Sequence, residues 1–395
     1  MQNLKENIEK LNNYLSDTSY NDIDIVDLIK YLSSKFGVKQ EIQKEKYQRL
    51  EEYIGDSKKV LLVLVDGLGY YKVNELSDSS ILKKNLMTGI RTVNPTSTEC
   101  VLTSVCSAKY PSEHGIFGWW QYLRSKNLNY CPLPMVERKT GKKVEDKGIN
   151  IKEVFEFESI FEKLNTTVNI SMPRELISSS YSRMFSGSKA STHGFYSIRE
   201  GFMNMSKKLK NSDTSFSYLY IDGLDAASHM YGVNSQEVKN IISEVEEGIK
   251  FIKNDNDDVK VIVIADHGQV DMVSMMYLNQ NTDYTKYFYA LPSIDTRMIS
   301  FFVKDEAKEE FEEKFLSEFN KDVILLKKSE IEKYKIFGNT KLSKKAKENL
   351  GEYIGIVVND KFMVCDKINI EDCLNTKGNH SGLTKKETTI PLIVI

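Results

Sequence analysis

The chain has 395 residues, of which 41% are hydrophobic and 28% are charged, a composition typical of a folded globular protein. Lysine and arginine number 54 and aspartate and glutamate 56, giving a formal charge of −2. This near balance argues against a general nucleic-acid coat and against electrostatic capture by an anionic membrane.

No apolar run reaches the roughly 18–20 residues of a membrane-spanning helix, and the first residues lack a signal-peptide core. The five cysteines are odd in number, far apart and without a CxxC pair. Reduced thiols and a cytoplasmic location are therefore expected.

Residues 1–55 are predicted to form an N-terminal helical segment. Asn21 or Asp22 is the expected cap of a helix that ends at Gly37, and a second, strongly charged helix stops at Gly55. Nothing in this segment suggests chemistry.

Three short apolar runs then predict buried strands: KKVLLVLVDG from residue 58, FSYLYIDG from residue 216 and VKVIVIADHG from residue 259. Continuous runs of β-formers are typical of strands covered on both faces. Between the last two, residues 235–254 carry apolar side chains at helical spacing. Strand, helix and strand in this order indicate a βαβ unit and a parallel sheet.

Two stretches are interpreted as insertions that form a cap, at about residues 118–150 and 269–345. Within the second, residues 298–328 have a strand–helix–strand pattern, which predicts a small βαβ unit beside the main sheet.

Acidic residues follow each predicted buried strand. Asp66 and Asp266 end the first and third strands, and Asp222 and Asp225 follow the second. Because the carboxyl ends of parallel strands meet at one sheet edge, where ligands bind, these acids are expected to be neighbours.

Histidines accompany the acids. His267 directly follows Asp266, His229 lies one helical turn after Asp225, and His380 lies in the glycine-containing loop KGNHSG. Carboxylates and imidazoles together are typical ligands of zinc, with manganese or iron as alternatives, and clustered carboxylates repel unless a cation holds them. His114 is expected to be structural and His193 to lie on a surface loop.

The run NPTSTECVLTSVC places hydroxyls at the start of a predicted helix through residues 101–106. Such hydroxyls are usually caps. The free N–H groups of a helix start also suit a phosphate, and a metal ion can activate a threonine hydroxyl as a nucleophile.

The ordered set VDG, NPTSTECVLTSVCSAKYPSEHGI, DGLDAASH, ADHG and GNHSG resembles the alkaline phosphatase superfamily. The closest branch is that of the nucleotide pyrophosphatase/phosphodiesterase (type I phosphodiesterase) enzymes, in their bacterial form. The resemblance runs from about residue 59 to the end. It implies an α/β fold with a mostly parallel central sheet flanked by helices, in a catalytic domain over residues 56–395.

The resemblance also implies a site. Thr98 would be the nucleophile, and two divalent ions, zinc above all, would be held by Asp66, Asp266, His267 and Thr98 and by Asp225, His229 and His380. The expected activity is hydrolysis of a small phosphorylated substrate, possibly a nucleotide, through a phospho-threonine. Glu99, Cys100 and Val101 replace the Phe-Pro-Asn of better-known members.

Alternatives remain open from the sequence. A phosphomonoesterase or a phosphomutase would use the same metal ligands. A sulfatase is disfavoured because Cys100 lacks the proline and arginine context of a formylglycine precursor, and a non-catalytic binding module because every expected ligand is present.

Overall fold

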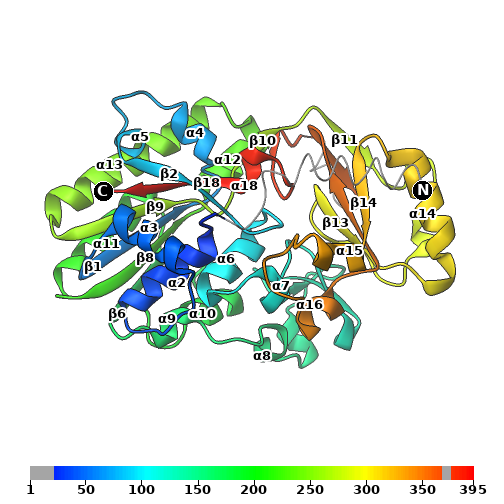
Figure 1. The fold of residues 1–395 in the computed structure, drawn as a ribbon, viewed down its shortest axis with the longest axis horizontal. Coiled ribbons are helices and arrows are strands. Elements are labelled where there is room, and N and C mark those ends of the chain that lie inside the picture. Colours follow the sequence, from blue (N-terminus) through cyan, green and yellow to red (C-terminus); the bar gives the residue numbers. More distant parts are fainter. Residues whose placement is uncertain (1–21, 367–374) are drawn as a thin grey trace.

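A computed structural model describes residues 22–366 and 375–395. Its centre is a seven-stranded sheet in the order β2-β18-β9-β1-β8-β6-β7 (Figure 1). The pairings make β18 antiparallel to both its neighbours, while the other strands run in one direction. The strands are β1 (Lys59–Val65), β2 (Leu86–Arg91), β6 (Thr167–Pro173), β7 (Ser191–Phe195), β8 (Ser215–Ile221), β9 (Val259–Ile264) and β18 (Thr389–Val394).

The three strands expected from the apolar runs are β1, β8 and β9, at the centre of this sheet. They are parallel neighbours, with Val63 opposite both Leu219 and Val263. Nearly every side chain along them is buried, as continuous apolar runs predict for strands covered on both faces. The predicted α/β fold with a mostly parallel central sheet is confirmed.

Helices cover both faces of the sheet. The connections to β2, β8 and β9 contain α4 (Tyr70–Asn74), α11 (Ile198–Lys210), α12 (Gly223–Tyr231) and α13 (Gln236–Asp255). The connections that run toward the β7 edge contain α6 (Thr98–Ser107), α9 (Ile160–Lys163) and α10 (Ser180–Ser186). Because crossovers between parallel strands are right-handed, the two groups lie on opposite faces.

Helix α13 packs on α11 at a glycine. An ideal Cβ built on Gly248 would lie 2.0 Å from Phe202 Cδ2 of α11. Although alanine is favoured over glycine within a helix by about 1 kcal/mol, we expect Gly248→Ala to lower the free energy of unfolding by about 1–3 kcal/mol. Urea unfolding measures it, with the exposed Ser243→Ala in the same helix as control. A Gly248→Ala protein as stable as the control would contradict this packing.

The N-terminal helices are α2 (Ile25–Lys35) and α3 (Lys44–Ile54). The expected cap was wrong, because Asp24 accepts the N–H of Asp27 and forms a capping box with it; Asn21 lies outside the described residues. Asp24 is the cap because it directly precedes the first helical turn, where its carboxylate reaches a free N–H group. Apolar residues of both helices belong to the core of the central sheet, and the domain boundary at residue 55 stays a prediction.

Further small sheets lie beside the central one, toward the right of Figure 1. Residues 118–150 contain a three-stranded sheet. A four-stranded sheet has the order β12-β13-β15-β14, and two pairs join β10 with β17 and β11 with β16. Their strands are β3 (Gln121–Leu123), β4 (Leu128–Cys131), β5 (Val136–Glu137), β10 (Val270–Asp271), β11 (Ser274–Tyr277), β12 (Ser293–Ile294), β13 (Met298–Phe301), β14 (Val323–Lys327), β15 (Tyr353–Val357), β16 (Lys361–Val364) and β17 (Gly378–Asn379).

The strand–helix–strand pattern of residues 298–328 is present as β13, α14 (Lys308–Phe319) and β14. The two strands are parallel to each other but not adjacent, because β15 lies between them and is antiparallel to both. The unit is therefore a split βαβ. The remaining short helices are α5 (Ile81–Lys84), α7 (Pro111–His114), α8 (Ile151–Val154), α15 (Lys328–Lys333), α16 (Lys344–Asn349) and α18 (Lys385–Thr388).

The structure also bears on the expectations for His193, for the cysteines and for membrane-spanning helices. His193 lies in edge strand β7 and contacts Ser191, so its placement on a loop was wrong. The four cysteines within the described residues are free thiols, while Cys373 lies outside them. Among the described helices, none combines the length and the apolar character that crossing a membrane requires.

Candidate metal centre

Acidic side chains from three adjacent strands meet at one edge of the central sheet. Asp66 directly follows β1, Asp266 follows β9, and Asp225 lies in the first turn of α12, which begins after β8. Because β9, β1 and β8 are parallel neighbours, these carboxyl ends share an edge. Residues 200 positions apart in sequence therefore lie side by side.

Asp66, Asp266 and His267 form one cluster, whose ligand atoms all lie within 4.8 Å of one another. His267 Nε2 is 3.4 Å from Asp66 Oδ1 and 3.3 Å from Asp266 Oδ2. All three side chains are almost completely buried. The other oxygen of Asp266 accepts the backbone N–H groups of Gly67 and His267, which fixes the carboxylate in place.

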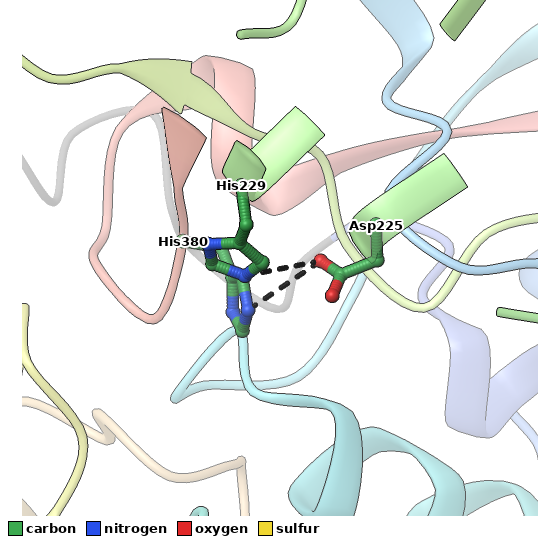
Figure 2. Close-up of side chains that lie close together, drawn as sticks. All are labelled: Asp225, His229 and His380. Atoms are coloured by element: carbon green, nitrogen blue, oxygen red, sulfur yellow. Dashed lines mark ion pairs between the residues drawn. The ribbon is translucent and has the colours of Figure 1, made fainter. Parts of the chain in front are cut away.

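Asp225, His229 and His380 form a second cluster with the same close spacing. Figure 2 shows both imidazoles turned toward Asp225, whose Oδ1 is 3.5 Å from His229 Nε2 and 3.6 Å from His380 Nε2. Asp225 and His229 share one face of α12, and His380 comes from the loop after β17. The rings of His380 and His267 stack at 3.8 Å, so the two clusters adjoin.

Backbone carbonyls fix the tautomers of two of these histidines. Nδ1 of His267 is 3.2 Å from the carbonyl of Gly268, and Nδ1 of His380 is 2.7 Å from the carbonyl of Thr96. A carbonyl can only accept, so Nδ1 carries the proton in each ring. The Nε2 atoms of both rings then face carboxylate oxygens, and a histidine that ligates a metal commonly has its other ring nitrogen bonded in this way.

The first cluster contains carboxylate oxygens that accept no hydrogen bond. Asp66 Oδ1 and Asp266 Oδ2 are buried and have no hydrogen-bond partner. Burial and the nearby carboxylates of Asp266 and Asp225 hold the pKa of Asp66 well above its usual range. Buried lone pairs facing one another are costly unless a cation lies between them, so the residues present fit a divalent ion.

The second cluster is more evenly charged. Burial would raise the pKa of Asp225, but His229 and then His380 more than offset it, so this pKa lies below its usual range. Burial is likewise overcome at His229, where Asp225 raises the pKa to about 9. At His380, burial and then the neighbouring His267 lower the pKa to about 4. One carboxylate and two imidazoles remain a suitable ligand set for zinc.

Thr98 places its hydroxyl beside the first cluster. Its Oγ1 is 3.4 Å from Asp66 Oδ2 and 3.3 Å from His267 Nε2. The two preceding hydroxyls are engaged elsewhere, because Thr96 donates to the carbonyl of Gly382 and Ser97 contacts Glu99 and Asp295. Thr98 is also partly exposed at the first position of α6, between two buried neighbours.

Several contacts at the site were not anticipated from the sequence. The hydroxyl of Tyr220 donates to Asp66, and Gln269 donates to Asp225. Tyr220 lies on β8, two residues before Asp222, and Gln269 follows the ADHG segment, so position at the sheet edge could have identified both. Asp295 lies in the tight turn between β12 and β13, where an acid carries no signal of its own.

Two other candidates lie outside the clusters. Asp222 immediately precedes α12 and belongs to neither cluster. Burial raises the pKa of its carboxyl. His114 is buried between α6 and α7, where it contacts Ser104 and accepts the N–H of Ile116. Burial and then Lys109 lower its pKa to about 3, so His114 is neutral and joins two helices.

Known proteins share this architecture. The chain resembles the solved structure of murine ectonucleotide pyrophosphatase/phosphodiesterase 5 with a TM-score of 0.64 and 15% identity, covering 85% of this chain and 87% of that one. The structure of an inactive variant of the murine protein in complex with AMP has a TM-score of 0.64 and 14% identity, and the match covers 85% of this chain and 87% of that one. The human protein gives 0.61 and 15%, again covering 85% and 87%. No curated protein matches the chain.

The sequence itself also matches a family. Residues 60–383 match the model of the type I phosphodiesterase/nucleotide pyrophosphatase family. This stretch includes the central strands, both clusters and Thr98. The chain therefore belongs to the type I phosphodiesterase/nucleotide pyrophosphatase family of hydrolases.

Proposed function

We propose that this protein hydrolyses phosphodiesters through a phospho-threonine at a site with two divalent metal ions. The observation that carries the proposal is the position of Thr98 Oγ1, beside a buried acid–histidine cluster that adjoins a second one. A hydroxyl in that position is held by its neighbours, so the entropy of bringing it to a bound phosphate is reduced.

The chain's ligand sets divide into two groups. Asp66, Asp266 and His267, with Thr98, would hold one ion; Asp225, His229 and His380 would hold the other. Zinc suits these nitrogen and oxygen donors, and manganese or iron are alternatives. When bound, such ions lower the pKa of a coordinated hydroxyl or water and neutralise charge on phosphate oxygens.

Thr98 supplies the nucleophile. Its Oγ forms a bond to phosphorus while the bond to one ester oxygen breaks, releasing an alcohol and leaving the other ester group on phospho-threonine. Water then cleaves the Thr98–phosphorus bond and yields a phosphomonoester. Ser97 makes no side-chain cap on α6, so its hydroxyl does not occupy the N–H groups at the start of this helix, and groups of this kind can bind phosphate oxygens.

Charge around Thr98 favours a diester over a monoester. Asp295 lies beside Ser97, whose hydroxyl is 3.1 Å from Asp295 Oδ2 and 2.8 Å from Glu99 Oε2. Burial and then the nearby Asp295 raise the pKa of Glu99 to about 8, so Glu99 adds little negative charge at neutral pH. Within residues 22–366 and 375–395, no lysine or arginine forms an ion pair with these acids or with the two clusters. A phosphodiester carries one negative charge and a monoester about two, so the monoester is repelled more.

Nucleotide esters are the first substrates to try, because a fold relative has been solved in complex with AMP. Turnover of a nitrophenyl nucleotide diester should exceed turnover of nitrophenyl phosphate with zinc present. Faster hydrolysis of the monoester would instead support the phosphomonoesterase alternative, and transfer of phosphate within one sugar would support a phosphomutase.

Asp295→Asn should narrow the preference for diesters. Removing one charge beside the site is worth about 1 kcal/mol more to a dianion than to a monoanion, so the monoester-to-diester ratio of kcat/KM should rise roughly five- to tenfold. Asp305→Asn, an exposed acid paired with Lys308 in the same insertion, is the control and should leave the ratio unchanged. An unchanged ratio in Asp295→Asn would remove Asp295 from specificity.

A further inference from the structure

A buried arginine joins the four-stranded sheet to the C-terminal part of the chain. Arg297 immediately precedes β13 and its side chain is fully buried. Its Nε and Nη2 donate to the two carboxylate oxygens of Glu387, at 2.8 and 3.1 Å. Nη1 donates to the carbonyls of Asn359 and Lys361, at 2.7 and 2.6 Å. The guanidinium is therefore anchored on both sides, in the bidentate geometry typical of strong arginine–carboxylate pairs.

Glu387, in α18, extends this anchor to the loop that carries His380. Glu387 Oε1 accepts the N–H of Gly382 at 2.8 Å, and its other oxygen accepts the N–H and the hydroxyl of Thr384. The backbone N–H of Arg297 also donates to Ser381 Oγ, at 3.1 Å. The two residues after His380 are thus bonded to the arginine–glutamate pair.

The opposite side of the same loop is bonded to the nucleophile segment. Thr96 accepts the N–H of Ser381 and the Nδ1–H of His380 on its carbonyl, and its hydroxyl donates to the carbonyl of Gly382. Thr96 lies two residues before Thr98. The loop 380–382 is held between the arginine–glutamate pair and the start of α6.

The loop has a conformation that needs such support. Ser381 has φ +80°, in the left-handed region that is unfavourable for residues other than glycine. At Gly382, a Cβ would lie 2.7 Å from Glu387 Oε2 and 3.0 Å from Arg297 Nε. The pair therefore packs directly on the backbone that aims His380 Nε2 at Asp225. Conformations of this kind persist where surrounding contacts fix them.

We propose that Arg297 and Glu387 are positioning residues that set the orientation of His380 and thereby the metal affinity of the Asp225–His229–His380 cluster. The inference rests on the proposed function, because it takes these three side chains as ligands. It goes beyond that function by giving the four-stranded sheet a role, as the source of the residue that fixes a ligand more than 80 positions away in sequence.

The decisive variant replaces both members of the pair, Arg297→Met with Glu387→Leu. Exchanging a buried ion pair for apolar residues of similar volume is often neutral for stability, whereas removing one partner leaves a lone buried charge. We expect a variant that folds but unfolds at a lower temperature than the wild type, because buried backbone groups lose hydrogen-bond partners. The N–H of Gly382 and the carbonyls of Asn359 and Lys361 lose their partners, so zinc affinity at the His380 cluster should fall about 10- to 100-fold.

Stepwise zinc titration by calorimetry measures this effect, and the step missing from His380→Ala identifies the His380 cluster. The step belonging to Asp66, Asp266 and His267 should stay unchanged. The control pair is Arg138→Met with Asp366→Leu, since Arg138 likewise donates to a carboxylate and to a carbonyl, that of Pro292. If the double variant at Arg297 and Glu387 fails to fold, Ser381→Ala removes one link alone and should lower the same affinity severalfold.

Equal zinc affinities in the wild type and in every folded variant of this set would overturn the inference. A parallel weakening of both zinc steps would overturn it too, because a general structural role would act on both. If the wild type itself bound no zinc and hydrolysed no diester, the proposed function would fail. If the wild type bound two zinc ions and the variants bound them equally well, only the positioning role of Arg297 and Glu387 would fail.

Discussion

Thr98→Ala is expected to abolish phosphodiester hydrolysis while both metal ions stay bound. Removing the nucleophile of a covalent mechanism typically costs about 10⁴-fold or more in kcat. The other hydroxyls of the segment cannot replace it, because Thr96 and Ser97 are bonded to Gly382, Glu99 and Asp295. The three acid–histidine ligands of each cluster remain in the variant, so metal content should hold.

Steady-state turnover and elemental analysis of the same preparations test this expectation. Thr98→Ser keeps a hydroxyl in place and should retain most of the activity. Thr103→Ala, in the same helix but bonded to Tyr181, should be active as well. Turnover within tenfold of wild type in Thr98→Ala would remove Thr98 from its role.

Asp266→Asn is expected to have opposite effects on activity and on the stability of the metal-free protein. Oδ1 of Asp266 must remain an acceptor for Gly67 and His267, so the new amide nitrogen would take the place of Oδ2. In that position the amide nitrogen would replace an expected metal-ligating oxygen. It would also donate to neighbouring lone pairs that have no donor in the wild type. Activity should fall at least about 10³-fold, as expected when a metal ligand and its ion are lost.

Without metal, the same variant should be more stable than the wild type. The exchange removes one charge from a cluster whose ligand atoms lie within 4.8 Å of each other. Like charges at such distances repel by about 1–4 kcal/mol at the effective dielectric of a protein, and part of this should be regained. Chelator-treated samples unfolded in urea at neutral pH measure the gain. Asp222→Asn, an acid at the same sheet edge outside both clusters, is the control, and a destabilised metal-free Asp266→Asn would contradict the account.

Local patterns in the sequence predicted the three strands at the centre of the main sheet and the acids that follow them. The runs at β1, β8 and β9 are recognisable because strands buried on both faces require continuous β-formers. Once those strands are parallel, Asp66, Asp225 and Asp266 must share an edge, so their proximity follows from topology. His380 could be placed beside them only by the family resemblance, since the chain reaches it through a small two-stranded pair far along the sequence.

Other features depend on tertiary contacts that no local pattern reports. The split of β13 and β14 by β15 is set by pairing with a strand about 50 residues away from β13. Asp295 and Arg297 contact residues that are distant in sequence, such as Ser97 for Asp295 and Glu387 for Arg297. The choice of Asp24 over its neighbours as helix cap depended on where the first helical turn begins, which propensity alone does not define.

The most direct test of the account is a crystal structure of zinc-soaked protein with anomalous scattering measured at the zinc edge. The account predicts two peaks at the carboxyl edge of the central sheet, one contacted by Asp66, Asp266, His267 and Thr98 and the other by Asp225, His229 and His380. A single peak, or zinc bound away from these side chains, would contradict it.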